Sequence, residues 1–281
     1  MADPSVLRRF SAHAARYDGH AHVQRLSARD LLERTVSSFS ERKIPGPEGE
    51  PAPGEGRAFN ILEPGCGTGI YTEMLLAAFP GASVVGVDLS EAMVRVASRR
   101  IRDPRARFVV ADAEEIPGGK YDLVSSNATF QWFLSFPQTV ARMASLLDRE
   151  GVLTFSFFGQ GTYAELDEAL GEASAVREGA GARVRVAAAG FPAREEISAA
   201  LSSAFSRWDM EERTYRQEFP TLVDLMRSIR YTGTWRGEKG GGFSPGRLAR
   251  VEAAYRRRHG GIRATYQVYL CRGDKAGSEG G

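Results

Sequence analysis

Residues 60–70 read Asn60-Ile61-Leu62-Glu63-Pro64-Gly65-Cys66-Gly67-Thr68-Gly69-Ile70, and the fold can be worked out from this stretch. The apolar run at 58–62 predicts a β-strand, and the apolar residues that follow from Ile70 at helical spacing predict a helix. The glycines between them let the backbone adopt positive φ angles and let a ligand approach closely. The free N–H groups at the start of the helix favour an anionic group. A glycine-rich turn alone fits an ordinary loop equally well. The strands that follow it are therefore needed to decide whether this turn binds a ligand.

A second β-rich run, residues 83–88, ends at Asp88, nineteen positions beyond Gly69. In dinucleotide-binding folds an acidic residue at about this spacing binds the ribose hydroxyls. The nicotinamide fingerprint G-x-G-x-x-G would require a glycine at position 70, where this chain has Ile70. The pattern therefore favours a nucleoside without a pyrophosphate.

The following strands carry polar residues at the same ends. Asp112 follows the third predicted strand and is placed to accept from an adenine amino group, and Asn127 ends the fourth strand. Ser90 suits a helix N-cap, and Leu89 and Met93 beside it could pack on adenine, although a core position suits Met93 as well. Because ligands of such sheets bind beyond the carboxyl ends of the strands, these groups share one crevice. The predicted nucleoside-binding residues are Glu63, Gly65, Gly67, Gly69, Asp88, Leu89, Met93, Asp112, Ala113 and Asn127.

This series of strand ends resembles the class I S-adenosylmethionine-dependent methyltransferases. The resemblance implies S-adenosyl-L-methionine as the cofactor and an α/β, Rossmann-like fold whose seven-stranded, mostly parallel sheet has helices on both faces. The resemblance also implies a helical insert between strands six and seven. Apolar residues at helical spacing from Val6 to Phe39 predict N-terminal helices, whose polar residues form either a solvated face or a cap across the crevice. The expected regions are a cap at 1–42, a flexible Pro/Gly-rich loop at 43–57, an S-adenosylmethionine-binding core at 58–158, a C-terminal part at 159–272 that holds a loop-like stretch at 171–190 and the insert, and a disordered tail at 273–281.

The composition fits a globular protein, with 42% hydrophobic and 26% charged residues among 281. The formal net charge of +2 gives no reason to expect a nucleic-acid partner. We expect neither a membrane span nor a signal peptide, because no apolar run approaches the roughly 18 residues that crossing a bilayer takes. Cys66 and Cys271 lie far apart and outside any metal-ligand spacing, so we expect no metal and a reducing, cytoplasmic location. We expect Cys66 to be a small side chain that fits the tight turn, and the alternative is a nucleophile.

Segments outside the glycine turn narrow the resemblance to one family, the malonyl-[acyl-carrier-protein] O-methyltransferases of biotin synthesis. The segments that carry it are Phe10-Ser11…Tyr17…His20…Gln24, Ser126-Asn127-x-x-x-Gln131-Trp132, Phe155-Ser156-x-Phe158-Gly159-x-Gly161-Thr162-x-x-Glu165-Leu166, Leu225-Met226-Arg227-Ser228-Ile229-Arg230-x-x-Gly233 and Thr265-Tyr266-Gln267-Val268-Tyr269-Leu270. They follow one another in order along nearly the whole chain. The chain departs from the family at Glu63-Pro64, where Asp-Ala is commoner, and at 43–57, which resembles an insertion.

The resemblance implies methyl transfer to the free carboxylate of a malonyl thioester, which yields a methyl ester and S-adenosylhomocysteine. A carboxylate is already ionised at neutral pH, so no general base is required, but it needs a partner when it leaves water. Bidentate arginine suits that role, although an exposed helix position is the alternative for each arginine. The predicted residues around the acceptor are Tyr17, Gln131 and Arg230 as catalytic residues and His20, Trp132 and Arg227 as substrate-binding residues.

The expected partner is an acyl carrier protein, which is an acidic helical protein, with malonyl-CoA as the alternative source of the malonyl group. A basic rim would help an acidic partner to dock, and its candidates lie on the last predicted helix: Arg247, Arg250, Arg256, Arg257 and Arg258. Scattered surface arginines are the alternative. Three rival functions are a methyltransferase for another small carboxylic acid or a quinone precursor, a protein that binds S-adenosylmethionine without transferring methyl, and a nicotinamide oxidoreductase, which Ile70 disfavours.

Overall fold

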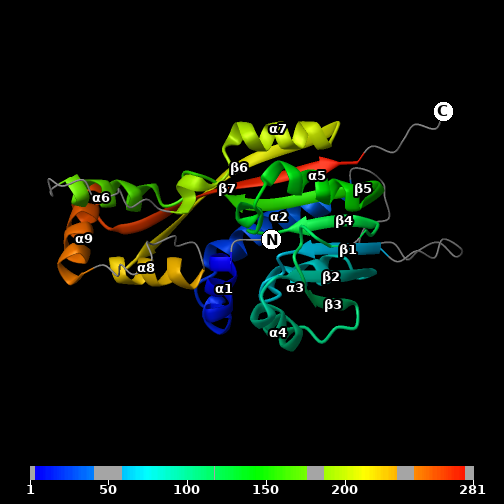
Figure 1. Ribbon diagram of the computed structural model, residues 1–281, viewed down its shortest axis with the longest axis horizontal. Helices are drawn as coiled ribbons and strands as arrows, with labels where there is room; N and C mark the ends of the chain where they lie inside the picture. Colours follow the sequence, from blue (N-terminus) through cyan, green and yellow to red (C-terminus); the bar gives the residue numbers. More distant parts are fainter. Residues whose placement is uncertain (1–3, 41–58, 117, 176–186, 233–243, 276–281) are drawn as a thin grey trace, which may run out of the picture.

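The computed structural model describes residues 4–40, 59–116, 118–175, 187–232 and 244–275. At its centre lies a seven-stranded sheet in the order β3-β2-β1-β4-β5-β7-β6 (Figure 1). Its strands are β1 (Phe59–Pro64), β2 (Ala82–Asp88), β3 (Ala106–Val110), β4 (Tyr121–Ser126), β5 (Leu147–Phe158), β6 (Arg207–Phe219) and β7 (Ile262–Asp274). The strands β1 to β5 pair in parallel, and β7 runs antiparallel to both of its neighbours. The predicted Rossmann-like α/β fold with a mostly parallel sheet is confirmed.

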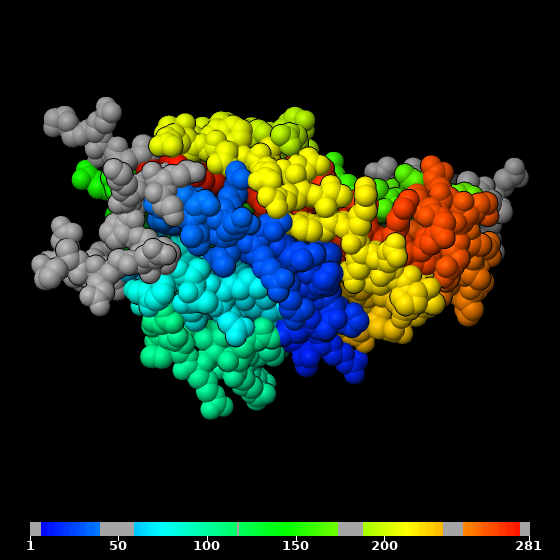
Figure 2. Space-filling model, turned by 180° about the vertical axis from the view of Figure 1, so that it is seen from behind, coloured from blue at the N-terminus to red at the C-terminus, as the bar shows by residue number. Residues whose placement is uncertain are grey.

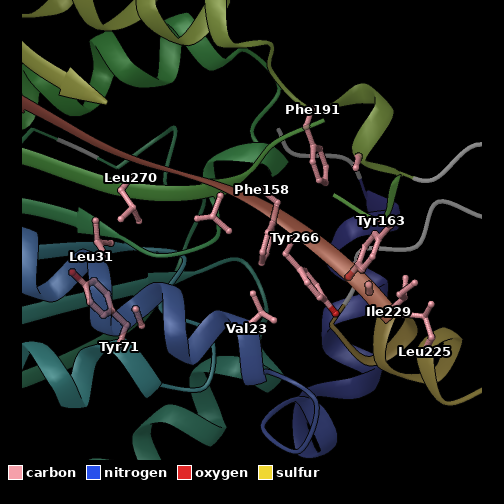
Figure 3. Close-up of a cluster of buried hydrophobic side chains, with 14 of the residues drawn as sticks. Val23, Leu31, Tyr71, Phe158, Tyr163, Phe191, Leu225, Ile229, Tyr266 and Leu270 are labelled. Carbon is pink, nitrogen blue, oxygen red and sulfur yellow. The ribbon is translucent and has the colours of Figure 1, made fainter. Parts of the chain in front are cut away.

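Neighbouring residues of the central strands are buried on opposite faces of the sheet. Ile61 and Leu123 belong to one hydrophobic cluster, and the residues that follow them, Leu62 and Val124, belong to another. A strand that is covered on both faces has no polar side. The first cluster (Figure 3) includes side chains of α2 (His22–Ser40) and α3 (Ile70–Ala78), and the second those of α5 (Phe136–Leu146) and α7 (Arg194–Ala204). Helices therefore cover both faces, as predicted.

Hydroxyl groups also fix α2 to the sheet. Ser27 Oγ donates to Ser156 Oγ at 2.9 Å, and the Thr35 and Thr154 hydroxyls lie 2.9 Å apart. These side chains are fully buried, where an unpaired hydroxyl would cost free energy. These contacts hold α2 in one position on β5. They therefore also fix the position of the turn between α1 and α2 at its α2 end.

The first helix lies between two helices from distant parts of the chain. α1 (Pro4–Tyr17) contacts α4 (Glu91–Arg100) on one side and α8 (Leu222–Tyr231) on the other, and both Figure 1 and Figure 2 show α1 beside α8. α6 (Ala164–Ala175) and α9 (Pro245–His259) pack on each other, at the same end of the molecule as α8 (Figure 1). The insert between β6 and β7 that the resemblance implied therefore consists of α8 and α9 in the part of the chain that the structure describes.

The last strand is longer than predicted. The prediction began a disordered tail at Gly273, whereas β7 runs to Asp274, with Gly273 opposite Leu153 of β5 and Trp208 of β6. The ring of Phe205 explains the glycine, because a Cβ at position 273 would come 2.3 Å from it. The predicted loop at 43–57 and the tail from 276 lie outside the described residues. So do residues 176–186 of the predicted loop-like stretch, whose described ends belong to α6 and to the short helix η2 (Ala187–Gly190).

Candidate functional site

Two adjoining cavities lie at the carboxyl ends of β1, β2 and β4. The larger cavity reaches from the end of β2 to the short helix η1 (Phe130–Trp132), and the smaller one lies against the start of α3. The residues that line both are Tyr17, Gly65, Gly67 and Asn127. One ligand can therefore extend from the first cavity into the second past the glycine turn.

The glycine turn forms the wall between β1 and the ligand site. Gly65, Gly67 and Gly69 have φ angles of +70°, +54° and +82°, a region that residues with a Cβ rarely adopt. A Cβ at Gly65 would come 2.3 Å from Thr129, whereas a Cβ at Gly67 would meet nothing within 4 Å. Gly69 lines neither cavity; it precedes α3, and a Cβ there would come 3.3 Å from Ala97 of α4. The first two glycines shape the ligand site, and the third allows two helices to pack closely.

Asp88, at the end of β2, lines the larger cavity. Its carboxylate accepts hydrogen bonds from Gly67 N at 3.0 Å and from Ser90 N at 2.8 Å, one on each oxygen. Burial raises the pKa of Asp88 to about 6, although these two hydrogen bonds lower it. Asp88 is therefore ionised at neutral pH, and each oxygen keeps a lone pair that can accept from a ribose hydroxyl.

Glu63, at the end of β1, lines the smaller cavity and is almost completely buried. Thr72 Oγ1 donates to Glu63 Oε2 at 2.5 Å. Burial, and secondarily the nearby Asp88, raise the pKa of Glu63 to about 8, against the opposing effect of the Thr72 hydrogen bond. No Lys or Arg of the described ranges forms an ion pair with it. A buried carboxyl without a counter-charge suits a ligand that brings its own positive charge.

The other predicted cofactor residues divide into two groups. Leu89, Met93 and Ala113 line the larger cavity. Asp112 does not, although its neighbours on both sides do; its Oδ1 accepts from Glu114 N at 3.0 Å. Asn127 lines both cavities, but its side-chain amide holds the protein together. The Nδ2 atom donates to the Gln24 carbonyl at 3.1 Å and Oδ1 accepts from a serine hydroxyl at 2.7 Å.

Helix α1 forms the lid of this site, a term used here for residues 4–17. Leu7 and Phe10 line the larger cavity, and Tyr17 lines both. The Phe10 ring meets the Trp132 ring edge-on, with 5.8 Å between centroids, so the lid and η1 close on each other. Burial, and secondarily Asp88, hold the pKa of Tyr17 well above its usual range. Its hydroxyl therefore stays a protonated hydrogen-bond donor at the junction of the two cavities.

Polar contacts that the sequence did not reveal fasten the lid. Thr68 Oγ1 in the glycine turn donates to Asp18 Oδ1 at 2.6 Å, and Arg100 at the end of α4 pairs with the same carboxylate. The hydroxyls of Ser11 and Ser90 lie 2.8 Å apart. Asp18 lies in a polar stretch without a recognisable pattern, so only the folded chain shows which partners it finds.

The predicted acceptor-side residues do not all gather in the cavities. Tyr17 and Trp132 line them, whereas His20, Arg227 and Arg230 do not. Gln131 is buried next to Trp132; its Nε2 donates to the Ala128 carbonyl at 2.8 Å, and its Oε1 has no hydrogen-bond partner among the described residues. The roles predicted for these side chains therefore need separate arguments.

His20, Arg227 and Arg230 lie where the lid meets α8. The His20 ring lies 4.6 Å from the Tyr231 ring, centroid to centroid. Arg227 is exposed and pairs with Asp224 at 2.7 Å, three positions away on the same helix, and Arg230 is exposed as well. Burial, and secondarily the positive charge of Arg227, lower the pKa of His20. The positive charge where α1 meets α8 is therefore carried by arginine side chains and not by His20.

The described ranges contain no group of three or more His, Cys, Asp or Glu side chains that could hold a metal ion. Both cysteines are free and buried. Burial raises the pKa of the Cys66 thiol, so it stays protonated and is a poor nucleophile, which agrees with its reading as a filler of the turn. Among the described helices, none combines the length and apolar character that a membrane span needs.

Comparison with known proteins identifies the family. Residues 61–151 match a family model described as a methyltransferase domain. The malonyl-[acyl-carrier protein] O-methyltransferase of Bacillus cytotoxicus is 30% identical over 283 residues, which cover 99% of this chain and 94% of that protein. The enzyme of the same name from Paenibacillus sp. (strain JDR-2) is 32% identical over 83% of each chain. The one from Priestia megaterium is 37% identical over 162 residues, a stretch that spans only 54% of that protein.

Solved structures share the fold at low sequence identity. The YcgJ protein from Bacillus subtilis superimposes with a TM-score of 0.56 over 88% of this chain and 99% of that chain, at 17% identity. A protein from Bacillus halodurans C-125 gives a TM-score of 0.52 over 78% of this chain and 94% of that chain, at 15% identity. These likenesses concern the fold alone, whereas the relative from Bacillus cytotoxicus matches nearly the full length of both chains. On that basis the chain belongs to the malonyl-[acyl-carrier protein] O-methyltransferase family.

Proposed function

We propose that the protein transfers the methyl group of S-adenosylmethionine to the free carboxylate of a malonyl thioester borne by an acyl carrier protein. The products are the malonyl methyl ester and S-adenosylhomocysteine. The observation that carries the proposal is the pair of joined cavities in a member of this family, one lined by Asp88 and the other by the buried Glu63, which has no basic partner among the described residues. A nucleoside joined to a cationic amino acid matches those two carboxyl groups.

The residues of this chain fit the methyl donor part by part. Asp88 is placed to accept from ribose hydroxyls, and Leu89 and Met93 offer apolar contact to a base. Glu63 is placed to pair with an α-ammonium group, which would supply the missing counter-charge. When bound, S-adenosylmethionine supplies a methyl group on a positively charged sulfur, which already makes that methyl electrophilic.

The task left to the protein is to position the acceptor and exclude water. The malonyl carboxylate is ionised at neutral pH and needs no base. Tyr17 stands at the junction of the cavities, where its hydroxyl could donate to that carboxylate and replace a lost water. Leu7 and Phe10 would keep solvent away from the reacting groups. Favourable positioning of this kind can account for roughly 7–11 kcal/mol of a reaction barrier.

Gln131 and the α8 arginines have supporting parts in this proposal. Gln131 holds the Ala128 carbonyl with its Nε2, in a turn where Ala128 itself has a φ of +54°. It would thereby keep the Asn127–Trp132 segment in the shape that lines the cavity. Arg227 and Arg230 are exposed on α8 and would meet the part of the substrate that stays outside the cavities.

The resemblance to this family also suggests how the ester product would be used in the cell. Removal of the negative charge would let the chain-extending enzymes of fatty-acid synthesis accept the malonyl thioester as a primer for the pimeloyl chain of biotin. The free cysteines Cys66 and Cys271 support a reducing, cytoplasmic setting for this step.

Product analysis by mass spectrometry tests the proposal. The purified protein is mixed with S-adenosylmethionine and, in parallel reactions, with malonyl-carrier protein, malonyl-CoA, malonyl-pantetheine or other small carboxylic acids. We expect a mass gain of one methylene on the malonyl group, with one S-adenosylhomocysteine formed per ester and the carrier-borne substrate used most efficiently. If no malonyl thioester is esterified while the protein still binds S-adenosylmethionine, the proposed function is wrong.

A further inference from the structure

We propose that the acyl carrier docks on the place where α1 meets α8, and not on α9. We call this surface the α1–α8 seam and define it by Arg8, Arg9, His13 and Arg16 of α1 and Arg227 and Arg230 of α8. The inference rests on the proposed function, because it takes an acidic carrier protein as the bearer of the malonyl group. This location differs from the docking surface predicted from the sequence, which was the last helix.

The seam is a continuous surface built around the Tyr231 ring. The His13 and His20 rings lie 5.0 and 4.6 Å from it, centroid to centroid. Arg16 Nη1 donates to the Tyr231 hydroxyl at 3.0 Å, and the guanidinium carbon of Arg16 lies 5.7 Å from the ring centre. Figure 2 shows α1 and α8 side by side on one face of the molecule, so both helices are open to a partner from the same direction.

Three arginines of the seam have no acidic partner within the described part of the chain. Helix α1 contains no acidic residue at all. Arg8, Arg16 and Arg230 are exposed and form no ion pair with a described acidic side chain. The acidic groups nearby are already engaged: Asp224 pairs with Arg227, and Asp18 pairs with Arg100. Arg8, Arg16 and Arg230 therefore offer positive charge to an acidic surface without first having to break an internal ion pair.

The rim predicted on α9 is different, because three of its five arginines form ion pairs. Arg256 pairs with Glu252 four positions away on the same helix, and Arg257 and Arg258 pair with Glu172 and Glu168 of α6. Docking an acidic partner there would require it to compete with these carboxylates. The ion pairs give α9 a structural task, namely to hold the α6–α9 pair together, although exposed pairs of this kind contribute little each.

The seam also lies at the entrance to the ligand site. The guanidinium carbon of Arg9 lies 6.0 Å from the centre of the Trp132 ring, which lines the larger cavity. On α1 the inward side chains Leu7 and Phe10 line that same cavity, while the exposed Arg8 lies between them in sequence and faces another direction around the helix. A carrier seated on the outer side of α1 could thus pass its malonyl arm along the edge of the lid.

Charge reversal on the two helices tests the docking surface. The seam variant is Arg8→Glu/Arg16→Glu, and the matched control, with the same change of net charge, is Arg257→Glu/Arg258→Glu on α9. Binding of malonyl-carrier protein to the full-length protein saturated with S-adenosylhomocysteine is measured by calorimetry at low and at physiological salt. We expect the seam variant to bind the carrier at least tenfold more weakly at low salt and to lose most of the salt dependence of the wild type. We expect a change below twofold in the control.

A second measurement separates docking from structural damage. Arg16 contacts Tyr231, so the single variant Arg8→Glu, which changes an exposed side chain without such a contact, is measured beside the double variant. Turnover of malonyl-pantetheine, which has no protein to dock, should change less than twofold in Arg8→Glu while KM for malonyl-carrier rises about threefold or more. Equal loss for both substrates, or carrier binding unchanged in both seam variants, would overturn the docking site. A wild type that esterifies malonyl-pantetheine but binds the carrier without salt dependence would overturn docking and leave the proposed function standing.

Discussion

The floor and the lid of the ligand site are built in different ways. The floor, residues 63–69 and 88–93, is held by contacts between two neighbouring strand ends, such as the hydrogen bond from Gly67 N to Asp88. The lid is held by side chains from distant parts of the chain: Ser11 meets Ser90, Asp18 meets Thr68, and Arg16 meets Tyr231, 215 positions away. The floor is therefore specified by a local motif and has little room to adjust. The lid depends on a few polar contacts that can open while the sheet stays folded.

The largest effect on S-adenosylmethionine binding is expected at Gly65, where the floor has no room for an added side chain. In Gly65→Ala the new Cβ would come 2.3 Å from Thr129, in a backbone conformation with φ of +70°. Either the turn or the Asn127–Thr129 segment must move, and both line the ligand site. We expect S-adenosylmethionine to bind about a hundredfold more weakly, a loss of about 3 kcal/mol, as measured by calorimetry.

Gly67→Ala is the matched control for this clash. Its φ is also positive, +54°, but a Cβ there meets nothing within 4 Å. The variant carries the backbone strain, about 1 kcal/mol, without a clash inside the protein, and should bind the donor at least about fivefold more weakly because Gly67 also lines the ligand site. Equal losses in the two variants would mean that strain, and not the contact with Thr129, sets the tolerance of the floor.

A substitution of Glu63 tests whether this carboxyl pairs with a positive charge on the ligand. In Glu63→Gln the side chain keeps its shape but cannot pair with an ammonium group. Because hydrogen bonds to charged groups contribute about 1.5–3 kcal/mol, we expect S-adenosylmethionine to bind about thirtyfold more weakly at pH 8. Binding of the free nucleoside adenosine, which lacks the amino acid, should be unchanged, and a parallel loss for adenosine would contradict the proposed pairing.

The pH dependence of stability tests the same carboxyl without any ligand. The pKa of Glu63 in the folded protein, about 8, lies above the roughly 4.3 of an unperturbed glutamate. The folded state thus holds the proton of the Glu63 carboxyl more tightly than the unfolded state does. The free energy of unfolding of the protein therefore falls as the pH rises between those two values, by up to about 1.4 kcal/mol per pH unit. Relative to Glu63→Gln, the wild type should lose stability in denaturant titrations up to pH 8 and then level off. Relative to Asp88→Asn, the wild type should stop losing stability near pH 6, because the pKa of Asp88 is about 6.

Tyr17 belongs to the lid but reaches the reacting groups. Tyr17→Phe removes one donor and leaves the ring, so the lid should still close. We expect kcat/KM for malonyl-carrier to fall about tenfold, with the dissociation constant of S-adenosylmethionine within threefold of the wild type. Tyr255→Phe is the control, because its hydroxyl donates to the Arg263 carbonyl between α9 and β7, outside both cavities; it should leave kcat/KM unchanged. A fall in donor affinity as large as that in kcat/KM would assign Tyr17 to cofactor binding alone.

The same contrast explains what the sequence could predict. Gly65 and Asp88 were predictable because strand, turn and helix follow one another in a short local pattern, and the sheet order follows from that pattern and the alternating strands. The pairing of Arg257 with Glu172 and of Arg258 with Glu168 spans 85 and 90 positions. Nothing near these residues distinguishes them from Arg8 or Arg16, which have no such partners. Whether an arginine is free or neutralised is decided by tertiary contacts, so the sequence alone could not separate Arg257 and Arg258 from Arg8 and Arg16 as candidates for a docking surface.

The smallest expected effect concerns the fastening of the lid by Asp18. Asp18→Asn keeps an acceptor for Thr68 but removes the charge that pairs with Arg100, a partly exposed pair that contributes about 0.5–1 kcal/mol. The open lid should become more populated, so S-adenosylhomocysteine should dissociate about three to five times faster in stopped-flow measurements, with kcat at saturating substrate within twofold. Asp103→Asn removes the pair with Arg105 just after α4, outside both cavities, and should leave the dissociation rate unchanged. If Asp18→Asn releases the product no faster, then the other contacts of the lid, namely the packing of Leu7 and Phe10 and the hydrogen bonds of Ser11 and Arg16, hold it closed, and the difference between a rigid floor and a releasable lid must lie in those contacts.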